Sequence, residues 1–382
     1  MKILHYSRYY PFPVAHELAR RQLEAGHEVL VACWPGMSRV PRGRSIYEGV
    51  PVHCFGVDVH SNPVRFSLAP LKVLREVNDF TSLTELFKRF DVVHVHAPTF
   101  YSYPALYSKL GITGWGLAKR LVKTPAVWTF HGHLNLIARY AQAIYNEMKY
   151  AEEKTAVSKE AAKALGVEWI PNGVNTQRFK PLGPSEIVEA KRRFNVPEGK
   201  VVVLMTARWV PRKGHDILVE ALTKLSEAER IKVYVMFVGP LDVGYIKYHD
   251  EVVRRLVKLG VGYGEFFVKF EDLPLVYNVC DVFVHPARAE GDPLVLPEAM
   301  ACGKPCVISS SCSYSRIING VNGFVANSVE GLSSYLRVLI HDEGLRKSLG
   351  KRALETALKY DWARINELYM KLYLRALYTQ RH

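Results

Sequence analysis

Two carboxylates, Glu290 and Glu298, stand eight positions apart in the stretch RAEGDPLVLPEAMACGKP and bracket the apolar residues 294–296. Because an unpaired charge in apolar surroundings is costly, both are expected to bind a polar partner. Pro297 suits the first position of a helix, which would place Glu298 near the positive end of the helix dipole. Two carboxylates at one site could accept hydrogen bonds from pairs of sugar hydroxyls. The alternative is a simple N-terminal helix charge at Glu298 and an exposed Glu290.

A second candidate site is basic. The sequence TARWVPRKGHD follows the predicted strand Val201–Met205 and places Arg208 and Lys213 in a loop, just before a helix expected near His215. A helix N-terminus with two cations suits a pyrophosphate group. The sequence has neither GxxxxGK[ST] nor a strand-linked GxGxxG, so the P-loop and dinucleotide fingerprints are absent. The alternative is a pair of solvated loop charges.

A third candidate is His131 in TFHGH, which is expected at the carboxyl end of a predicted strand. The spacing of His131 and His133 could suit a metal ion, but no nearby carboxylate or cysteine completes a ligand set, so a metal is not expected. His94 and His96 alternate along another predicted strand. They are expected to face one side of it, packed or hydrogen-bonded.

The elements that must position these residues are short apolar strands that alternate with helical patterns, twice along the chain. This alternation predicts parallel sheets built from βαβ units, and in such sheets ligands bind beyond the carboxyl ends of the strands. A chain of 382 residues exceeds the usual size of one core. The stretch rich in proline and glycine at 171–186 is a predicted hinge. The predicted domains are 1–178 with the helix 360–382, and 179–359.

Positive charge is concentrated in one part of the chain. The 51 Lys and Arg residues against 37 Asp and Glu give a formal net charge of +14. No acidic residue occurs between Asp91 and Glu147, where Lys119, Arg120 and Lys123 lie among aromatic residues. These cations predict a surface for anionic lipid headgroups or a phosphorylated acceptor, and the alternative is a solvated basic face. Nucleic acid is not expected, because no nucleic-acid-binding signature accompanies the charge.

The cysteine spacing and the N-terminal segment indicate in which cellular compartment the protein is expected. The six cysteines include no CxxC pair, which predicts buried free thiols. A Cys302–Cys306 or Cys306–Cys312 bridge is the alternative. The segment MKILHYSRYY lacks the apolar core of a secretory signal, and no apolar run approaches the roughly 18 residues of a membrane span. A cytoplasmic protein is expected, with peripheral attachment to the inner membrane face as an option.

Several segments together resemble one enzyme family. EGDPLVLPEAMACGKPCVIS resembles a Glu-x7-Glu motif, ARWVPRKGHDILVEAL a phosphate-binding Arg/Lys segment, and IPNGVNTQRFKP an interdomain stretch. The chain resembles, over nearly its whole length, the retaining nucleotide-sugar glycosyltransferases called "glycosyl transferases group 1". The resemblance implies an α/β fold of GT-B type, in which two Rossmann-like, doubly wound parallel-sheet domains face a cleft. It also implies a last helix that crosses back to the first domain.

The resemblance also implies roles for the candidate residues. Glu290 would contact the transferred sugar near the reacting face, and His131 would reach that sugar from the first domain. Two cations would bind the donor phosphates in place of a metal ion, and no cofactor would be needed. Glu298 would hold the ribose hydroxyls. The implied donor-binding residues are Arg208, Lys213, Glu298, Leu294 and Val295.

Two departures from the family pattern accompany this resemblance. Asp292 and Pro293 replace the usual Phe-Gly, which adds a negative charge near the expected phosphates and removes one backbone N–H donor. The loop SRYYPFPVAHE after the first strand lacks the usual Gly-Gly. The expected function is transfer of a hexose-type sugar from a nucleotide sugar to a glycan or lipid acceptor. The alternatives are a non-catalytic binding protein and a nucleotide-sugar epimerase or phosphorylase.

Overall fold

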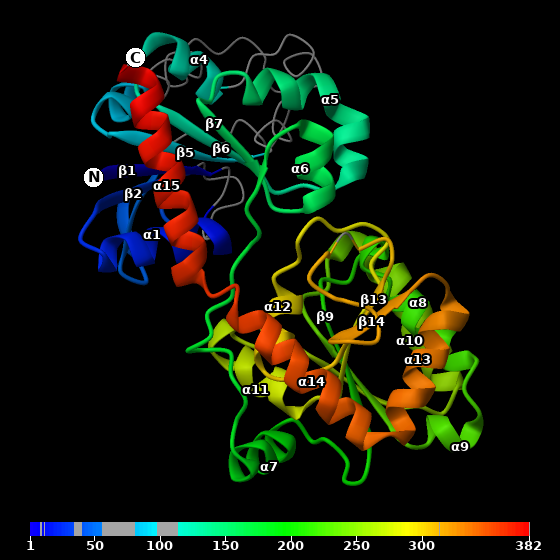
Figure 1. Cartoon of the computed structure of the whole chain (residues 1–382). Coiled ribbons are helices and arrows are strands. Elements are labelled where there is room, and N and C mark those ends of the chain that lie inside the picture. Colours follow the sequence, from blue (N-terminus) through cyan, green and yellow to red (C-terminus); the bar gives the residue numbers. More distant parts are fainter. Residues whose placement is uncertain are drawn as a thin grey trace. The chain divides into compact units, whose positions relative to one another are not determined.

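A computed structural model describes the chain in two compact units (Figure 1). The first unit contains Met1–Asn172 and Trp362–His382, and the second contains Gly173–Asp361. The chain therefore leaves the first unit once and returns to it with its last helix. The described residues are 1–7, 10, 12–33, 40–55, 81–97, 114–312 and 314–381.

The first unit is built on a sheet that has eight strands within the described residues. The strands are β1 (Lys2–Ser7), β2 (Glu28–Cys33), β3 (Gly43–Tyr47), β4 (Val50–Cys54), β5 (Val92–Ala97), β6 (Ala126–Phe130), β7 (Glu153–Ala156) and β8 (Glu168–Trp169). Their order is β3-β4-β2-β1-β5-β6-β7-β8. Neighbouring strands are parallel except β3 and β4. These two are joined by Glu48 and Gly49, which both have positive φ as a tight hairpin turn requires.

Helices cover both faces of this sheet. They are α1 (Pro13–Glu24), α4 (Gly114–Leu121), α5 (Leu134–Met148), α6 (Lys159–Leu165) and α15 (Trp362–Arg381). Helices α4, α5 and α6 enclose an apolar core around Trp115, Trp128 and Phe130. Helices α1 and α15 pack against each other and against strands of the sheet. Because side chains alternate along a strand, Leu4 and Tyr6 of β1 enter the apolar core and His5 points to the opposite face.

The return of the chain to the first unit depends on an apolar stripe on α15. Its buried residues recur every three or four positions, as expected for an amphipathic helix. They are Trp362, Ile365, Tyr369, Leu372, Tyr373 and Ala376. The helix packs on β5, β6 and β7. The predicted last helix that crosses back to the first domain is confirmed.

The second unit is built on a wholly parallel sheet in the order β11-β10-β9-β12-β13-β14. The strands are β9 (Val201–Thr206), β10 (Val233–Val238), β11 (Gly262–Phe266), β12 (Val282–His285), β13 (Cys306–Ser309) and β14 (Gly323–Ala326). The chain proceeds outward from β9 in one direction and from β12 in the other. The carboxyl ends of β9 and β12 therefore form the topological switch point, where doubly wound sheets bind ligands.

Two layers of helices cover the second sheet (Figure 1). Helices α11 (Leu273–Val279), α12 (Val295–Ala301) and α14 (Glu343–Leu358) enclose one apolar core. Helices α8 (His215–Thr223), α10 (Ile246–Lys258) and α13 (Val329–His341) enclose the other. The remaining helical segments are α7 (Pro184–Arg193), α9 (Glu227–Arg230), η4 (Pro211–Lys213), η5 (Val243–Tyr245) and η6 (Phe270–Asp272). The predicted α/β class with two Rossmann-like parallel sheets is confirmed.

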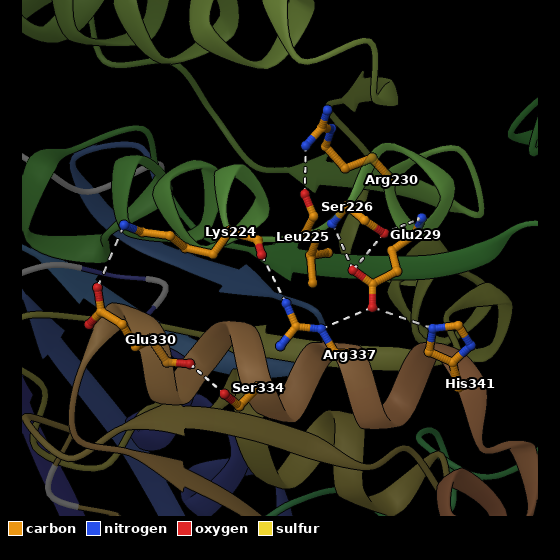
Figure 2. Close-up of polar contacts among 9 residues, drawn as sticks. All are labelled: Lys224, Leu225, Ser226, Glu229, Arg230, Glu330, Ser334, Arg337 and His341. Carbon is orange, nitrogen blue, oxygen red and sulfur yellow. Dashed lines mark hydrogen bonds and ion pairs between the residues drawn. The ribbon is translucent and has the colours of Figure 1, made fainter.

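A polar network joins α9 to α13, as Figure 2 shows. The Glu229 carboxylate accepts hydrogen bonds from the backbone N–H of Ser226 at 2.7 Å and from Nε of Arg337 at 2.9 Å. His341 Nε2 lies 3.4 Å from the same carboxylate. The backbone bond from Ser226 is the main reason that the pKa of Glu229 falls to about 2. The network therefore ties a four-residue helix to the layer beneath it.

Two further expectations concern cysteines and membrane spans. All six cysteines are free and buried, which confirms the prediction of buried thiols. Burial raises the pKa of Cys280 to about 12, so this thiol is inert at neutral pH. Across the part of the chain that the structure describes, no helix is both long enough and apolar enough to cross a bilayer.

Candidate active site

The candidate site of the second unit lies where β9 and β12 end side by side. Strand β9 leads through η4 into α8, and β12 leads through residues 286–294 into α12. Gly214 allows the two loops to meet: its φ is +80°, and a Cβ there would lie 2.1 Å from the carbonyl oxygen of Pro286. Only glycine tolerates both conditions.

An ion pair and a backbone hydrogen bond also join these loops. The Arg288 guanidinium binds the Asp216 carboxylate with two hydrogen bonds, of 2.9 and 2.5 Å. The backbone N–H of Arg288 donates to the carbonyl of Arg212 at 2.8 Å. Such two-bond pairs fix orientation as well as distance, so the basic loop is held in place against the loop that carries Glu290.

Glu290 is the centre of a compact charge cluster. Its Oε1 accepts a hydrogen bond from Arg212 Nη1 at 2.8 Å and another from Lys213 Nζ. His285 Nε2 lies 3.9 Å from the same oxygen. Burial alone would raise the pKa of Glu290, but Lys213, His285 and Arg212 outweigh burial and lower it. The carboxylate is thus ionised and paired although its side chain is only 11% exposed.

The structure brings together two residues that the sequence had placed in separate stretches, Lys213 and Glu290. It also adds Arg212, which sequence reasoning missed. The signal was the adjacent Arg-Lys pair in WVPRKG, which lies in the 3-10 turn η4, and both of its side chains donate to Glu290 Oε1. Arg208 is exposed at the end of β9, and its side chain has no hydrogen bond or ion pair within the described residues.

The helix that carries Glu298 starts earlier than predicted. Helix α12 starts at Val295 and not at Pro297, which is the third helical residue. Proline is tolerated there because the first four N–H groups of a helix have no partner within it. Leu294 and Val295 form the head of this helix. Glu298 is buried, and its Oε2 accepts a hydrogen bond from the Tyr277 hydroxyl at 2.6 Å.

The structure accounts for the unexpected Asp292. Its carboxylate is bound by the Arg316 guanidinium, and the two side chains are only 4% and 2% exposed. Arg316 also lies over the rings of Tyr314 and Tyr360, at 4.4 and 4.8 Å from their centroids. The negative charge of Asp292 is therefore neutralised by a buried cation, Arg316, which the sequence analysis did not pair with it.

His131 lies at the end of β6 in the first unit. Its backbone N–H donates to the Ala97 carbonyl at 2.8 Å, and its Nε2 lies 3.2 Å from Nδ1 of His96. The ring of Phe12 meets it edge-on, with centroids 5.0 Å apart. Burial lowers the pKa of His131 to about 3, so the ring is neutral at physiological pH.

Three buried histidines near His131 are close enough together to be considered for metal binding. They are His5, His94 and His96, and they indeed face one side of the sheet. Every ring nitrogen of the three has a hydrogen-bond partner within the protein. The centroids of the His94 and His96 rings are 4.1 Å apart, and the ring planes are inclined by 32° to each other. Metal ligands must instead point lone pairs at one centre, so this arrangement does not fit a metal site.

Not all cations of the predicted basic surface are available to bind an anionic partner. Lys119 is 9% exposed, and its Nζ lies 2.8 Å from the Glu152 carboxylate. Arg120 lies 5.2 Å from the ring centroid of Tyr150, and Lys123 is exposed. Of these three cations, Lys119 is therefore committed to an internal ion pair. Residues 98–113 of the basic stretch, and residues 8, 9 and 11 of the loop after β1, lie outside the described residues.

The arrangement can be compared with known proteins. Residues 187–356 match the family "Glycosyl transferases group 1", and residues 13–178 match "Glycosyltransferase Family 4". A sulfoquinovosyl transferase of Arabidopsis thaliana is 26% identical, over 89% of this chain and 65% of its own length. A Campylobacter jejuni N,N'-diacetylbacillosaminyl-diphospho-undecaprenol alpha-1,3-N-acetylgalactosaminyltransferase is 31% identical, over 54% of this chain and 53% of its own length. The matches thus span about half to two-thirds of these relatives.

One solved structure resembles the whole chain. The Anabaena protein HepE, in complex with UDP and glucose, superposes with a TM-score of 0.75 and covers 97% of this chain and 99% of its own. The two sequences are 18% identical. At this identity the likeness shows the fold, which is of GT-B type.

Proposed function

The chain belongs to the group 1 glycosyltransferases, and we propose that it transfers a hexose-type sugar from a nucleotide diphosphate sugar to an acceptor hydroxyl. The observation that carries this proposal is the cluster of Arg212, Lys213 and Glu290 at the switch point of the second sheet. It combines cations for a diphosphate with a carboxylate for sugar hydroxyls. The bound UDP and glucose of HepE support the donor class.

The cations are proposed to act on the leaving group. When the bond between the sugar C1 and the donor phosphate oxygen breaks, the diphosphate gains negative charge. Fixed cations stabilise this charge more in the transition state than in the ground state. Lys213 and exposed Arg208 would supply the positive charge that a divalent metal supplies in other transferases. The reaction is therefore proposed to need no metal ion and no cofactor.

The transfer is proposed to retain the configuration at C1. The new bond forms between C1 and the acceptor oxygen on the face that the diphosphate leaves, and the acceptor proton passes to a donor phosphate oxygen. Glu290 would orient the sugar, Glu298 would bind the ribose, and the amides of Leu294 and Val295 would face the donor. In the first unit His131 is the proposed sugar contact.

The acceptor is proposed to be lipid-linked or anionic. The Campylobacter jejuni relative is named for a diphospho-undecaprenol acceptor. The chain carries a net charge of +14, which favours association with anionic partners. With Lys119 paired internally, Arg120 and Lys123 are the cations of the predicted set that would meet such a partner. A cytoplasmic protein at the inner membrane face fits this acceptor.

The first prediction tests the donor site. We expect one of UDP, GDP, ADP and CDP to raise the unfolding midpoint with EDTA present, because a ligand that binds only the folded state stabilises it. Lys213→Ala should weaken the binding of that nucleotide roughly tenfold to a hundredfold, which is the effect of losing one charge-assisted hydrogen bond. Thermal shift and isothermal titration calorimetry measure both effects.

The matched control is Lys258→Ala, which removes an exposed lysine of α10 in the same unit. It should bind like the wild type. Equal weakening of nucleotide binding in both variants would contradict the proposal that Lys213 binds the donor phosphates. A nucleotide that binds without sugar transfer to any acceptor would favour a non-catalytic binding protein, whereas conversion of the sugar nucleotide without an acceptor would favour an epimerase.

A further inference from the structure

A line of four side chains connects helix α1 to His131 inside the first unit. Gln22 Oε1 lies 2.8 Å from His5 Nε2, and His5 Nδ1 lies 2.9 Å from His96 Nε2. His96 Nδ1 lies 3.2 Å from His131 Nε2. Gln22 and His5 are fully buried, and His96 is 4% exposed. The rings of His5 and His96 are therefore hydrogen-bonded through both nitrogens, whereas His131, at the end of the line, is hydrogen-bonded through Nε2 only.

The sheet register explains why these rings meet. Strands β1 and β5 are parallel neighbours, with Ser7 opposite His96 and His5 opposite His94. Side chains alternate between the faces of a strand. His5 and His96 therefore share the face that α1 and α15 cover. The diagonal between them is within reach of two imidazole rings.

Helix α15 determines how the Gln22 amide is oriented. The Gln22 amide nitrogen donates to Asn366 Oδ1 at 3.0 Å and to the Tyr373 hydroxyl at 3.4 Å. Both N–H groups of the amide are thus directed to α15. The oxygen Oε1 is left to face His5, and an amide oxygen can only accept a hydrogen bond.

This orientation determines the position of each proton along the line. A neutral imidazole carries one N–H, so one of its nitrogens donates and the other accepts. His5 must donate from Nε2 to Gln22, which leaves its Nδ1 to accept from Nε2 of His96. His96 Nδ1 must then accept from Nε2 of His131. We propose that Gln22 acts as a positioning residue that holds His131 in the tautomer with a proton on Nε2 and a lone pair on Nδ1.

The charges of the rings agree with this scheme. Burial is the largest cause of the lowered pKa at each ring, which reaches about 4 for His5 and about 3 for His131. The pKa of His96 also lies well below its ordinary value, through burial and then neighbouring histidines. All three rings are neutral at pH 7, so each carries the single N–H that the scheme requires.

A second branch starts from the same amide. The Tyr373 hydroxyl accepts from Gln22 and lies 2.8 Å from His94 Nδ1, to which it can donate. His94 Nε2 then donates to Thr129 Oγ1 at 2.8 Å, and Thr129 donates to Thr155. With the amide nitrogen of Gln22 facing α15, both branches have a consistent direction.

The consequence concerns Nδ1 of His131, which is buried and has no hydrogen-bond partner within the described residues. In the proposed tautomer this atom is an acceptor. Where His131 contacts a donor sugar, which rests on the proposed function, Nδ1 would accept a hydrogen bond from a sugar hydroxyl. It would neither donate to the sugar nor carry a positive charge toward the diphosphate.

The test is nitrogen-15 NMR of the histidine rings in the ligand-free full-length protein at pH 7. The His131 signals are identified by their loss in His131→Asn. We expect Nδ1 to resonate as an unprotonated nitrogen and Nε2 as a protonated one. A protonated Nδ1 in the wild type would overturn the proposal without any further variant.

Two substitutions of Gln22 test the source of the tautomer. Gln22→Leu removes the acceptor, so the two directions of the line become comparable and the His131 nitrogen shifts should move toward each other. Gln22→Glu keeps an acceptor at the same place and should restore the wild-type shifts. Unchanged shifts in Gln22→Leu would contradict the role of Gln22. Because the measurement needs no donor or acceptor, its result is independent of whether sugar transfer is observed.

Discussion

At the residue scale, the two carboxylates of the Glu-x7-Glu stretch have different surroundings. Glu290 is held by two cations from the neighbouring loop, whereas Glu298 accepts from the hydroxyl of Tyr277. Burial raises the pKa of Tyr277, and Glu298 raises it further, so this hydroxyl keeps its proton and donates. One carboxylate is thus compensated by charge and the other by a neutral donor. Both satisfy the rule that a buried charge needs a partner.

The buried pair of Asp292 and Arg316 gives the second prediction. Removing one partner leaves the other charge buried without compensation, which typically costs about 3–5 kcal/mol. We therefore expect Asp292→Asn and Arg316→Met each to lower the free energy of unfolding of the second unit by an amount in this range. Urea unfolding measures it.

The double variant is the control for this pair. Asp292→Asn with Arg316→Met leaves no unpaired charge, so its effect should be clearly smaller than the sum of the single effects. Additive effects would show that the two charges do not depend on each other.

At the element scale, the loop between β9 and α8 depends on Gly214 for its course. The third prediction is that Gly214→Ala both destabilises the second unit and weakens nucleotide binding. The added methyl would need a left-handed backbone, at about 1–2 kcal/mol, and would collide with the Pro286 carbonyl. The loop that carries Lys213 must then move. Urea unfolding and calorimetry with the nucleotide measure the two effects.

Gly260 provides a matched control, because its φ is +67° but a Cβ there would have no atom within 4 Å. Gly260→Ala should show the backbone strain alone and bind nucleotide normally. Equal losses of stability in both variants would indicate that the contact with Pro286 is unimportant.

The network between α9 and α13 gives the fourth prediction, on pH (Figure 2). The folded pKa of Glu229 is about 2, below the ordinary value of about 4.3. A carboxylate with a lowered pKa contributes stability above the unfolded pKa, and this contribution is lost as the pH falls toward the folded value. Glu229→Gln should therefore lower the urea midpoint at pH 7, and the difference from the wild type should shrink between pH 5 and pH 3.

The control for this helix is Glu227→Gln, an exposed residue of α9. Its midpoint should follow that of the wild type at every pH. If the difference for Glu229→Gln stayed constant from pH 7 to pH 3, the Glu229 carboxylate would not be the group responsible.

At the scale of the whole molecule, the net charge of +14 suggests association with anionic surfaces. The fifth prediction is that Arg120→Glu with Lys123→Glu weakens binding to vesicles that contain anionic lipid. Each cation near such a surface contributes about 1 kcal/mol, so the double reversal should reduce binding by roughly tenfold or more. Vesicle flotation measures the bound fraction.

Lys258→Glu combined with Lys247→Glu serves as the control, since both lysines are exposed on α10 of the other unit. It changes the net charge by the same amount. Equal loss of binding in both double variants would mean that net charge, and not the surface around Arg120 and Lys123, drives association. Unchanged binding after reversal at Arg120 and Lys123 would exclude this surface as the membrane contact.

The sequence by itself determined the architecture and indicated the loops of the candidate site. Apolar strands alternating with helices predict two parallel sheets, and the rule for their carboxyl ends points to the loops that carry Lys213 and Glu290. The stripe on the last helix likewise predicts a packed face. These properties follow from local periodicity, because side-chain direction repeats every 2 residues in a strand and about every 3.6 in a helix.

Only the tertiary structure decided which charged and polar groups meet. Asp292 binds Arg316, Lys119 binds Glu152, and Gln22 binds Asn366 across 344 positions of sequence. The sequence shows that each is polar but not which strand register or helix packing brings a partner within 3 Å. Hydrogen bonds, including those within these ion pairs, form only over such short distances. The pairing at the site and the histidine line therefore depend on the assembled sheets.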